Sequence, residues 1–252
     1  ATPTLSQQRK YPRLCIATIF IFRNEHSSYY ISAMYYPLNL NDVHIHPLFG
    51  DFLNGEPYIF DFSSKNSKTM EYNPADFKQF NDMVFDEMSR ISCKWGFGKY
   101  LEDRKNLLRD YPNIIEEKRY YHLGLDIIAP FDTPMFSPLD AEVYMTGKEM
   151  QIGNYGGYIM LKHDINNIVF YSFYGHLKTP HRVSPGDVIK AGQEFAKIGQ
   201  KSDSGGWFCH THLQILTQQA IDDGYTHWGY ISPELMASIE KYFPSPYFLF
   251  KY

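Results

Sequence analysis

Cysteine is scarce in this chain of 252 residues, which contains three: Cys15, Cys93 and Cys209. An odd number without a C-x-x-C pair argues against a disulfide framework and against a thiolate zinc site. A closed structural zinc site, which usually uses cysteine, therefore has no suitable ligand set here. Cys209 directly precedes a predicted strand, and strand alternation directs its side chain away from that of His210, so we expect a buried thiol.

An excess of positive charge and a long apolar run are also missing. The formal net charge is −4, which argues against binding to nucleic acid or to an anionic membrane surface. No run reaches the length of a transmembrane helix, so no membrane span is predicted. The apolar run 14–22 ends at Arg23 without a small-residue cleavage site, which favours a strand over a signal peptide. We expect a cytoplasmic protein, or one of the cell envelope or secreted if the chain was trimmed.

What the sequence does contain, from residue 120 to about residue 215, is a series of short strand-like runs separated by turn residues. This spacing predicts a mainly β fold, an antiparallel β-sheet or sandwich. The residues 164–167 are typical of a hairpin turn between two of the runs. The clearest predicted strands are 141–146, 158–163, 168–174 and 193–198.

Residues 1–118 have a different pattern and are predicted to form a smaller α+β segment, followed by the second domain at 119–252. The charged residues 116–119 mark the predicted border. The expected elements of the first segment are a hairpin of strands at 13–22 and 28–36, a strand at 58–62, a helix from its N-cap Asn73 and Pro74 to Ser92, an aromatic turn at 95–100, and a helical piece at 101–110 that Pro112 ends.

Two histidines stand two residues apart on the predicted strand 211–215. Side chains two apart share one face of a strand, so His210, His212 and Gln214 point the same way, while the alternate aliphatic residues face the core. Two imidazoles on one face suit a zinc site, although an isolated His-x-His is more often a surface pair. A second such pair, His44 and His46, is interpreted as structural.

The second cluster of candidate ligands is His122 and Asp126. In a straight strand these residues would lie about 13 Å apart, whereas two ligands of one zinc must each come within about 2 Å of the ion. The segment must therefore bend, and Gly124 permits the bend. Together with His212 they offer nitrogen, oxygen and nitrogen ligands. Three protein ligands leave the fourth tetrahedral position to water, the pattern of a catalytic zinc.

His176 lies at the end of a strand-like run, and neither it nor His210 is needed as a ligand. An imidazole beside the metal can take a proton from the attacking water, return it to the leaving amine, or hold the developing oxyanion. Each histidine alone is more often structural.

The order of these motifs resembles that of the M23 (LytM/lysostaphin-like) zinc metallopeptidases: His122-x-x-x-Asp126, then 174–177 with His176, then His210-x-His212. The connecting residues 129–134, 155–158 and 183–193 agree with the same family. The resemblance implies that His122, Asp126 and His212 hold Zn²⁺ and that His176 and His210 are catalytic. It further implies hydrolysis of peptide or amide bonds, with peptidoglycan cross-bridges as the default substrate.

The sequence departs from the family at Trp207 and Phe208, where the family usually has small residues, and these side chains are expected to reshape the substrate groove. In this respect the chain is closer to M23 modules found outside cell-wall lysins. An intracellular peptide or amide substrate therefore fits the sequence about as well as peptidoglycan does. Two alternatives stay open. One is a metal-loaded module that binds a peptide or glycan without turnover. The other is a site plugged by Asn54, His44 or His46. The oligomeric state is not determined by the sequence.

Overall fold

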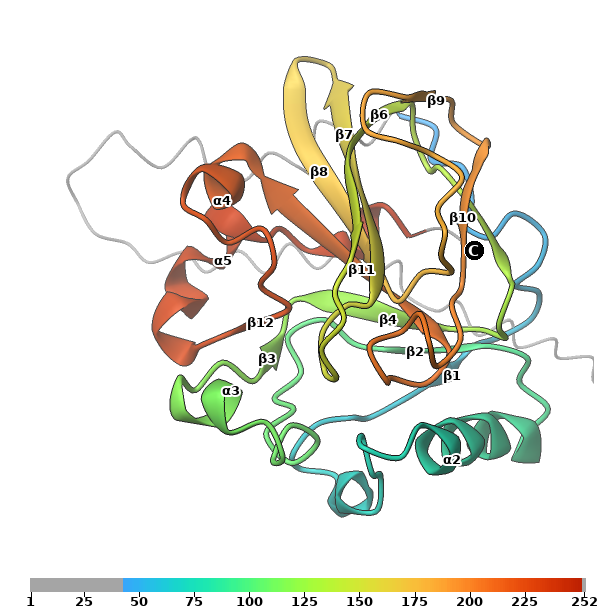
Figure 1. The fold of residues 1–252 in the computed structure, drawn as a ribbon, viewed down its shortest axis with the longest axis vertical. Coiled ribbons are helices and arrows are strands. Elements are labelled where there is room, and N and C mark those ends of the chain that lie inside the picture. Colours follow the sequence, from blue (N-terminus) through green and yellow to red (C-terminus); the bar gives the residue numbers. More distant parts are fainter. Residues whose placement is uncertain (1–42, 251–252) are drawn as a thin grey trace, which may run out of the picture. The chain divides into compact units, whose positions relative to one another are not determined.

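The computed structural model describes residues 43–250, so the predicted hairpin at 13–36 lies outside the described residues. The main feature is an eight-stranded sheet in which every pairing is antiparallel except that of β1 with β2 (Figure 1). This confirms the mainly β fold with an antiparallel sheet. The strands, in spatial order, are β1 (Tyr58–Ile59), β2 (Gly96–Gly98), β4 (Gly124–Ile128), β11 (His210–Thr217), β8 (Ile168–Gly175), β7 (Gly157–Ile165), β6 (Ala141–Lys148) and β9 (Val188–Ile189).

Two small sheets flank the main one. The strand β3 (Tyr121–His122) pairs with β12 (Tyr230–Ile231), and β5 (Pro134–Phe136) pairs with β10 (Glu194–Lys197). The chain therefore leaves one sheet at the end of β3 and enters another at Gly124, so His122 and Asp126 do not lie on one straight strand, consistent with the expected bend.

The helices are short, except for one. They are η1 (Ser67–Met70), α2 (Phe77–Arg90), α3 (Pro112–Glu116), α4 (Gln218–Asp222), η2 (Pro233–Ser238), α5 (Ile239–Tyr242) and η3 (Pro246–Phe248), where η marks a 3₁₀-helix. Within the part of the chain that the structure describes, no helix has the length and apolar character needed to cross a membrane.

The main core lies on one face of the eight-stranded sheet. The strand alternation of β11 directs Leu213 and Ile215 into this core, beside Leu125 and Ile127 of β4. Cys209 is buried in the same cluster, and burial raises the pKa of its thiol to about 11. The opposite face of β11 is therefore left for His210, His212 and their polar neighbours.

The long helix α2 packs against the loop that leads into β11. Phe80 of α2 contacts Phe208, with ring centroids 4.6 Å apart. The side-chain oxygen of Asn81, also on α2, accepts a hydrogen bond of 2.9 Å from the Cys209 amide. This helix therefore supports the start of the strand that carries the two histidines.

The start of α2 differs from the prediction. Asp76 is the N-cap, and its side chain accepts a hydrogen bond of 3.1 Å from the Gln79 amide. Asn73, the predicted cap, instead accepts from the Ala75 amide, so Pro74 lies in a turn before the helix. Both residues are good caps by type, and the one whose oxygen reaches the third helical amide sets the start.

Two further predictions in this region were wrong. Part of the predicted turn 95–100 is the strand β2, where glycine is required by packing: a Cβ atom at Gly98 would lie 2.7 Å from Nη2 of Arg104. Residues 101–110 form turns and one isolated bridge rather than a helical piece. Pro112 begins α3 rather than ending a helix, in the first-turn position that proline favours.

The strands β1 and β2 precede the predicted border at residues 118 and 119, yet both belong to the main sheet, where β2 pairs with β4. Segments from both sides of that border therefore form one sheet. The division into 1–118 and 119–252 stays a prediction.

Candidate active site

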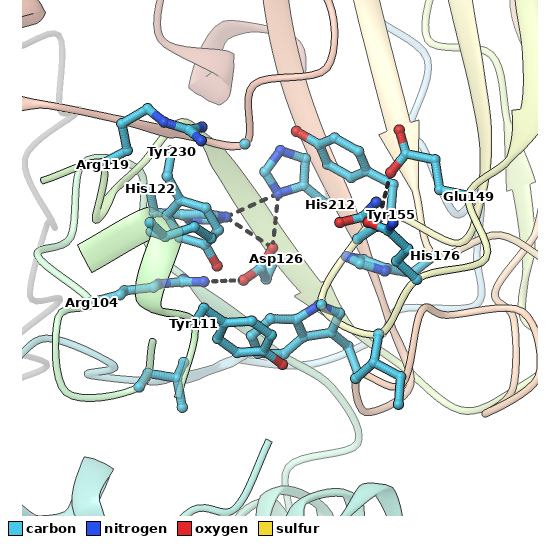
Figure 2. A pocket seen from close by; sticks show the side chains of 18 of the residues that line it. Arg104, Tyr111, Arg119, His122, Asp126, Glu149, Tyr155, His176, His212 and Tyr230 are labelled. Atoms are coloured by element: carbon cyan, nitrogen blue, oxygen red, sulfur yellow. Dashed lines mark hydrogen bonds and ion pairs between the residues drawn. The ribbon is translucent and has the colours of Figure 1, made fainter. Parts of the chain in front are cut away.

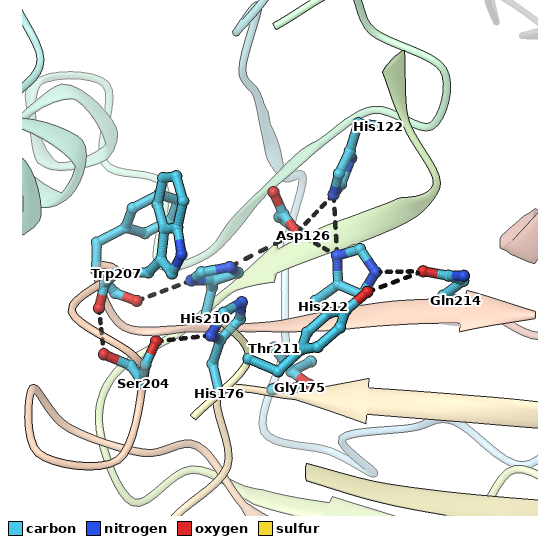
Figure 3. Close-up of polar contacts among 12 residues, drawn as sticks. His122, Asp126, Gly175, His176, Ser204, Trp207, His210, Thr211, His212 and Gln214 are labelled. Carbon is cyan, nitrogen blue, oxygen red and sulfur yellow. Dashed lines mark hydrogen bonds and ion pairs between the residues drawn. The ribbon is translucent and has the colours of Figure 1, made fainter. Parts of the chain in front are cut away.

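Backbone register brings the three candidate ligands together. Asp126 on β4 lies directly opposite His212 on β11, and His122 reaches the same point from β3. The Nε2 atom of His122 lies 2.9 Å from Nδ1 of His212. The Oδ1 atom of Asp126 lies 3.2 Å from the former nitrogen and 3.3 Å from the latter (Figure 3). All three side chains are buried, and their ligand atoms lie within 4.8 Å of one another.

The outer nitrogen of each imidazole is held by an acceptor. Nδ1 of His122 donates to the Lys99 carbonyl at 3.1 Å, and Nε2 of His212 donates to Oε1 of Gln214 at 2.9 Å. The amide nitrogen of Gln214 donates to the Trp228 carbonyl at 3.0 Å, which keeps its oxygen turned toward His212. Each outer nitrogen therefore carries the proton, and each inner nitrogen presents a lone pair.

The result is three acceptor atoms that face one another without a proton between them. Two imidazole lone pairs and a carboxylate oxygen repel each other at these distances, unless a cation lies among them. Nitrogen and carboxylate oxygen are ligands that zinc binds, and three protein ligands with one open position are typical of catalytic zinc sites. The donor set of His122, Asp126 and His212 therefore fits zinc.

The protonation states agree with this fit. Burial alone would raise the pKa of the Asp126 carboxyl, but the charged guanidinium of Arg104 beside it holds that pKa well below its usual range. Burial, with a further contribution from Arg104, lowers the pKa of His122 to about 3. At neutral pH the site therefore offers an ionised carboxylate and a neutral imidazole, the forms in which these side chains bind metal.

His176 and His210 lie side by side next to the cluster, with ring centroids 4.3 Å apart. Nδ1 of His176 donates to the Ser204 carbonyl and Nδ1 of His210 to the Phe208 carbonyl, each at 2.8 Å (Figure 3). Nε2 of His210 is 3.6 Å from Oδ1 of Asp126. Because Nδ1 donates in each ring, Nε2 is the nitrogen that carries the lone pair in the neutral imidazole.

Burial keeps both of these histidines neutral. It lowers the pKa of His210 to about 4 and that of His176 well below the usual value, the latter with a contribution from the neighbouring His210. A neutral ring whose Nδ1 carries the proton can accept a second proton at Nε2. The backbone of His176 has a positive φ of 62°, in the left-handed region, directly after the end of β8 at Gly175.

A pocket of about 360 Å³ opens over the five residues (Figure 2). Trp207 and Phe208 line it, in agreement with the expectation that they shape the groove. Tyr111, just before α3, stacks on Trp207 with ring centroids 5.9 Å apart and lies so close to Gly153 that a Cβ there would be 2.3 Å from its ring. One wall of the pocket is therefore built by aromatic side chains from both sides of residue 118.

Several lining residues were not found from the sequence. The most consequential is Arg104, a buried residue whose Nη1 donates to Oδ2 of Asp126 (Figure 2). Its place in a run of charged residues gave no sign of this contact. Tyr155, whose ring lies 5.2 Å from that of His212, was also missed. Of the residues that surround His212, the sequence indicated Gln214, because strand alternation places it on the same face as His212.

The three residues considered as plugs do not reach the site. Asn54 is exposed and its amide donates to the Asp51 carbonyl, and neither it nor His44 nor His46 lines the pocket. His44 is exposed, whereas His46 is half-buried with Nδ1 3.0 Å from the Pro47 carbonyl. The structural role expected for the first His-x-His pair is consistent with this placement.

Comparison with known proteins identifies a family for part of the chain. The sequence profile of peptidase family M23 matches residues 120–223. A search of curated proteins finds no match.

Among solved structures, the chain is similar to a zinc-containing peptidase from Vibrio cholerae, with 26% identity and a TM-score of 0.32, over 39% of this chain and 28% of that one. It is similar to the catalytic domain of a mutant of the prophage-encoded M23 protein EnpA from Enterococcus faecalis, with 24% identity and a TM-score of 0.34, over 45% and 77% of the two chains. It is also similar to the catalytic domain of lysostaphin from Staphylococcus simulans, with 22% identity and a TM-score of 0.35, over 47% and 80%.

The chain thus spans less than a third of the Vibrio peptidase but most of the two isolated catalytic domains. All five predicted site residues lie inside the profile match. The match to peptidase family M23 thus extends over residues 120–223 and includes the three candidate metal ligands and both candidate catalytic histidines.

Proposed function

We propose that this protein is a zinc-dependent peptidase that hydrolyses a peptide or amide bond at the cluster of His122, Asp126 and His212. The observation that carries the proposal is the convergence of three unprotonated acceptor atoms, with Nε2 of His122 only 2.9 Å from Nδ1 of His212. Bound zinc acts as a Lewis acid, which polarises a carbonyl oxygen and makes water a nucleophile at neutral pH.

The chain's own residues would move the protons. His176 and His210 each hold Nδ1–H against a carbonyl, so Nε2 is the atom that can take a proton from the attacking water. The imidazolium so formed can return the proton to the leaving amine or stabilise the oxyanion. Both histidines fit these roles.

The pocket favours a segment of extended peptide as substrate. Its volume of about 360 Å³ and its aromatic wall of Tyr111, Trp207 and Phe208 suit a few residues rather than a folded partner. Family resemblance makes peptidoglycan cross-bridges the default substrate. The bulky wall specifically favours the second candidate, a soluble peptide or small amide.

The decisive experiment incubates the zinc-loaded protein with purified peptidoglycan and, separately, with a soluble peptide library. Cleavage that stops with a chelator and in a His210→Ala variant supports the proposal. Release of wall fragments assigns the wall substrate, and cleavage of soluble peptides alone assigns the second candidate. A protein that retains zinc and cleaves neither would instead be the binding module without turnover.

A further inference from the structure

We propose that Arg104, backed by Glu102, positions Asp126 so that one carboxylate oxygen alone is offered to the metal. This inference rests on the proposed zinc site and extends it to a residue outside the stretch that matches the family. Arg104 does not touch the reacting atoms, so it is a positioning residue rather than a catalytic one.

The two oxygens of Asp126 have separate partners. Oδ2 accepts a hydrogen bond from Nη1 of Arg104, while Oδ1 faces Nε2 of His122 at 3.2 Å and Nδ1 of His212 at 3.3 Å (Figure 2). A carboxylate without the guanidinium can rotate or offer both oxygens, and a two-oxygen ligand occupies the position that a catalytic zinc keeps for water. The arginine therefore fixes both the rotation and the number of oxygens available.

Glu102 makes this arrangement compatible with a divalent cation. A lone guanidinium so near the site would repel the metal through space. The Oε2 atom of Glu102 lies 3.1 Å from Nη2 and 3.3 Å from Nε of Arg104. The negative charge of Glu102 therefore offsets the positive charge of the guanidinium and reduces its repulsion of a bound cation. Glu102 is itself held by the Phe62 and Lys99 amides, each at 3.3 Å. Both members of the pair are buried, with exposed fractions of 2% for Arg104 and 7% for Glu102.

Packing leaves the guanidinium little freedom. Its central carbon lies 5.2 Å from the ring centre of Phe62, over the face of the ring. On β2, Gly98 pairs with Asp126 and leaves the space that the guanidinium fills, because a Cβ atom there would lie 2.7 Å from Nη2. Burial alone would lower the pKa of Arg104, but Asp126 and Glu102 raise it, so the side chain stays charged.

The position of Arg104 in the chain gives the inference its meaning. Residues 120–223 match the M23 profile and contain the three ligands, but Arg104 and Glu102 precede that stretch. Elements before the family domain therefore complete the surroundings of a metal ligand, since β2 and the turns at 101–110 carry the pair to Asp126.

The test measures zinc affinity by competition with a chromophoric chelator, using the full chain and the variants Arg104→Met, Arg104→Lys and the double variant Arg104→Met/Glu102→Gln. The double variant removes both charges together, so no unpaired buried carboxylate is left at position 102 to unfold the protein. Arg109→Met is the matched control, because Arg109 donates to the Asn106 and Tyr72 carbonyls and has no contact with Asp126.

We expect the double variant to bind zinc about 10- to 100-fold more weakly, the usual cost of losing a partner of a metal ligand. Arg104→Lys should recover part of that loss, since lysine keeps the charge but not the forked geometry. The Arg109→Met control should bind zinc like the wild type.

Folding is checked by circular dichroism. A folded double variant with wild-type zinc affinity would overturn the inference and leave the zinc site standing. A wild-type protein that binds no zinc would overturn the proposed function and this inference with it. A loss of stability in Arg104→Met without any change in zinc affinity would assign Arg104 a purely structural role, which also contradicts the inference.

Discussion

The chain contains two His-x-His pairs, and they lie in opposite surroundings. His44 and His46 belong to a loop where the first ring is exposed and the second only half-buried. His210 and His212 lie on β11, which pairs with β4 on one side and β8 on the other, and both are buried.

The difference shows that the spacing of the histidines alone does not produce the geometry of a candidate metal site. Nδ1 of His46 lies beside the carbonyl of its neighbour Pro47, and no carboxylate is among the partners described for this ring. His212 has a carboxylate placed opposite by strand register and a glutamine that fixes its tautomer. Register, burial and an outer hydrogen-bond partner together set the ligand atom's direction and protonation.

The most direct way to break the comparison is to remove one ring from each pair. If the wild type binds one zinc ion per chain, as we propose, His212→Ala should lose it, because two protein ligands hold zinc poorly. His46→Ala should retain it. Metal analysis of the purified proteins measures both, and full zinc retention in His212→Ala would refute its assignment as a ligand.

Substitutions of His210 and His212, the two members of the buried pair, should also differ in their effect on zinc binding. His210→Ala should keep zinc but lose about 10²- to 10⁴-fold in hydrolysis rate, the range for a lost acid–base or oxyanion group. His176→Ala should behave alike, while His44→Ala serves as the unaffected control. Release of metal from either active-site variant would make that histidine a ligand instead.

His163 is a buried histidine outside the candidate metal site, so it shows the effect of burial on a histidine by itself. It is buried on β7, donates from Nδ1 to the Asp140 carbonyl at 3.0 Å, and has a pKa lowered by burial from 6.5 to about 4. Protonation therefore favours the unfolded chain. Above pH 6.5 the protonation of His163 does not reduce the free energy of unfolding. As the pH drops from 6.5 toward about 4, it lowers that free energy by on the order of 3 kcal/mol.

Urea unfolding at a series of pH values measures this contribution, with His163→Gln as the comparison. The variant should lack this part of the pH dependence, although other buried histidines continue to contribute in both proteins. Parallel curves for the two proteins between pH 6.5 and 4 would show that His163 does not supply it.

The smallest expected effect concerns the partner that orients His212. Gln214→Leu removes the acceptor of the Nε2 proton, so the tautomer with a lone pair on Nδ1 is less favoured. Zinc affinity should fall about 10- to 100-fold. Gln218→Leu, at an exposed position on α4, is the control. An unchanged affinity in Gln214→Leu would mean that strand register alone directs the ring.

Much of the sheet could be predicted from the sequence, because its information is local. The runs that became β6, β7, β8 and β10 alternate and end at turn residues. The five site residues were chosen from spacing and resemblance, and the structure places all five around one pocket. Their chemical roles remain predictions.

What the sequence could not predict depends on tertiary pairing. Glycine at positions 96 and 98 is typical of a turn, but here both glycines lie in a strand. Gly98 permits close packing on Arg104, and Gly96 permits close approach to the Tyr58 carbonyl. The contact of Arg104 with Asp126 exists because β2 pairs with β4, a pairing between distant segments with no local signature. Likewise, Asp76 and Asn73 are equal as caps by type, and only the folded chain selects between them.

The pairing of β2 with β4 has a consequence for association between molecules. A domain limited to residues 120–223 would lack β2, and the backbone groups of β4 that now bond to Gly96–Gly98 would form an open strand edge. Open edges recruit strands from other chains and promote aggregation. The segment before residue 120 therefore shields the strand of Asp126 from a second molecule, and a shortened chain that begins at the family boundary should self-associate through that strand.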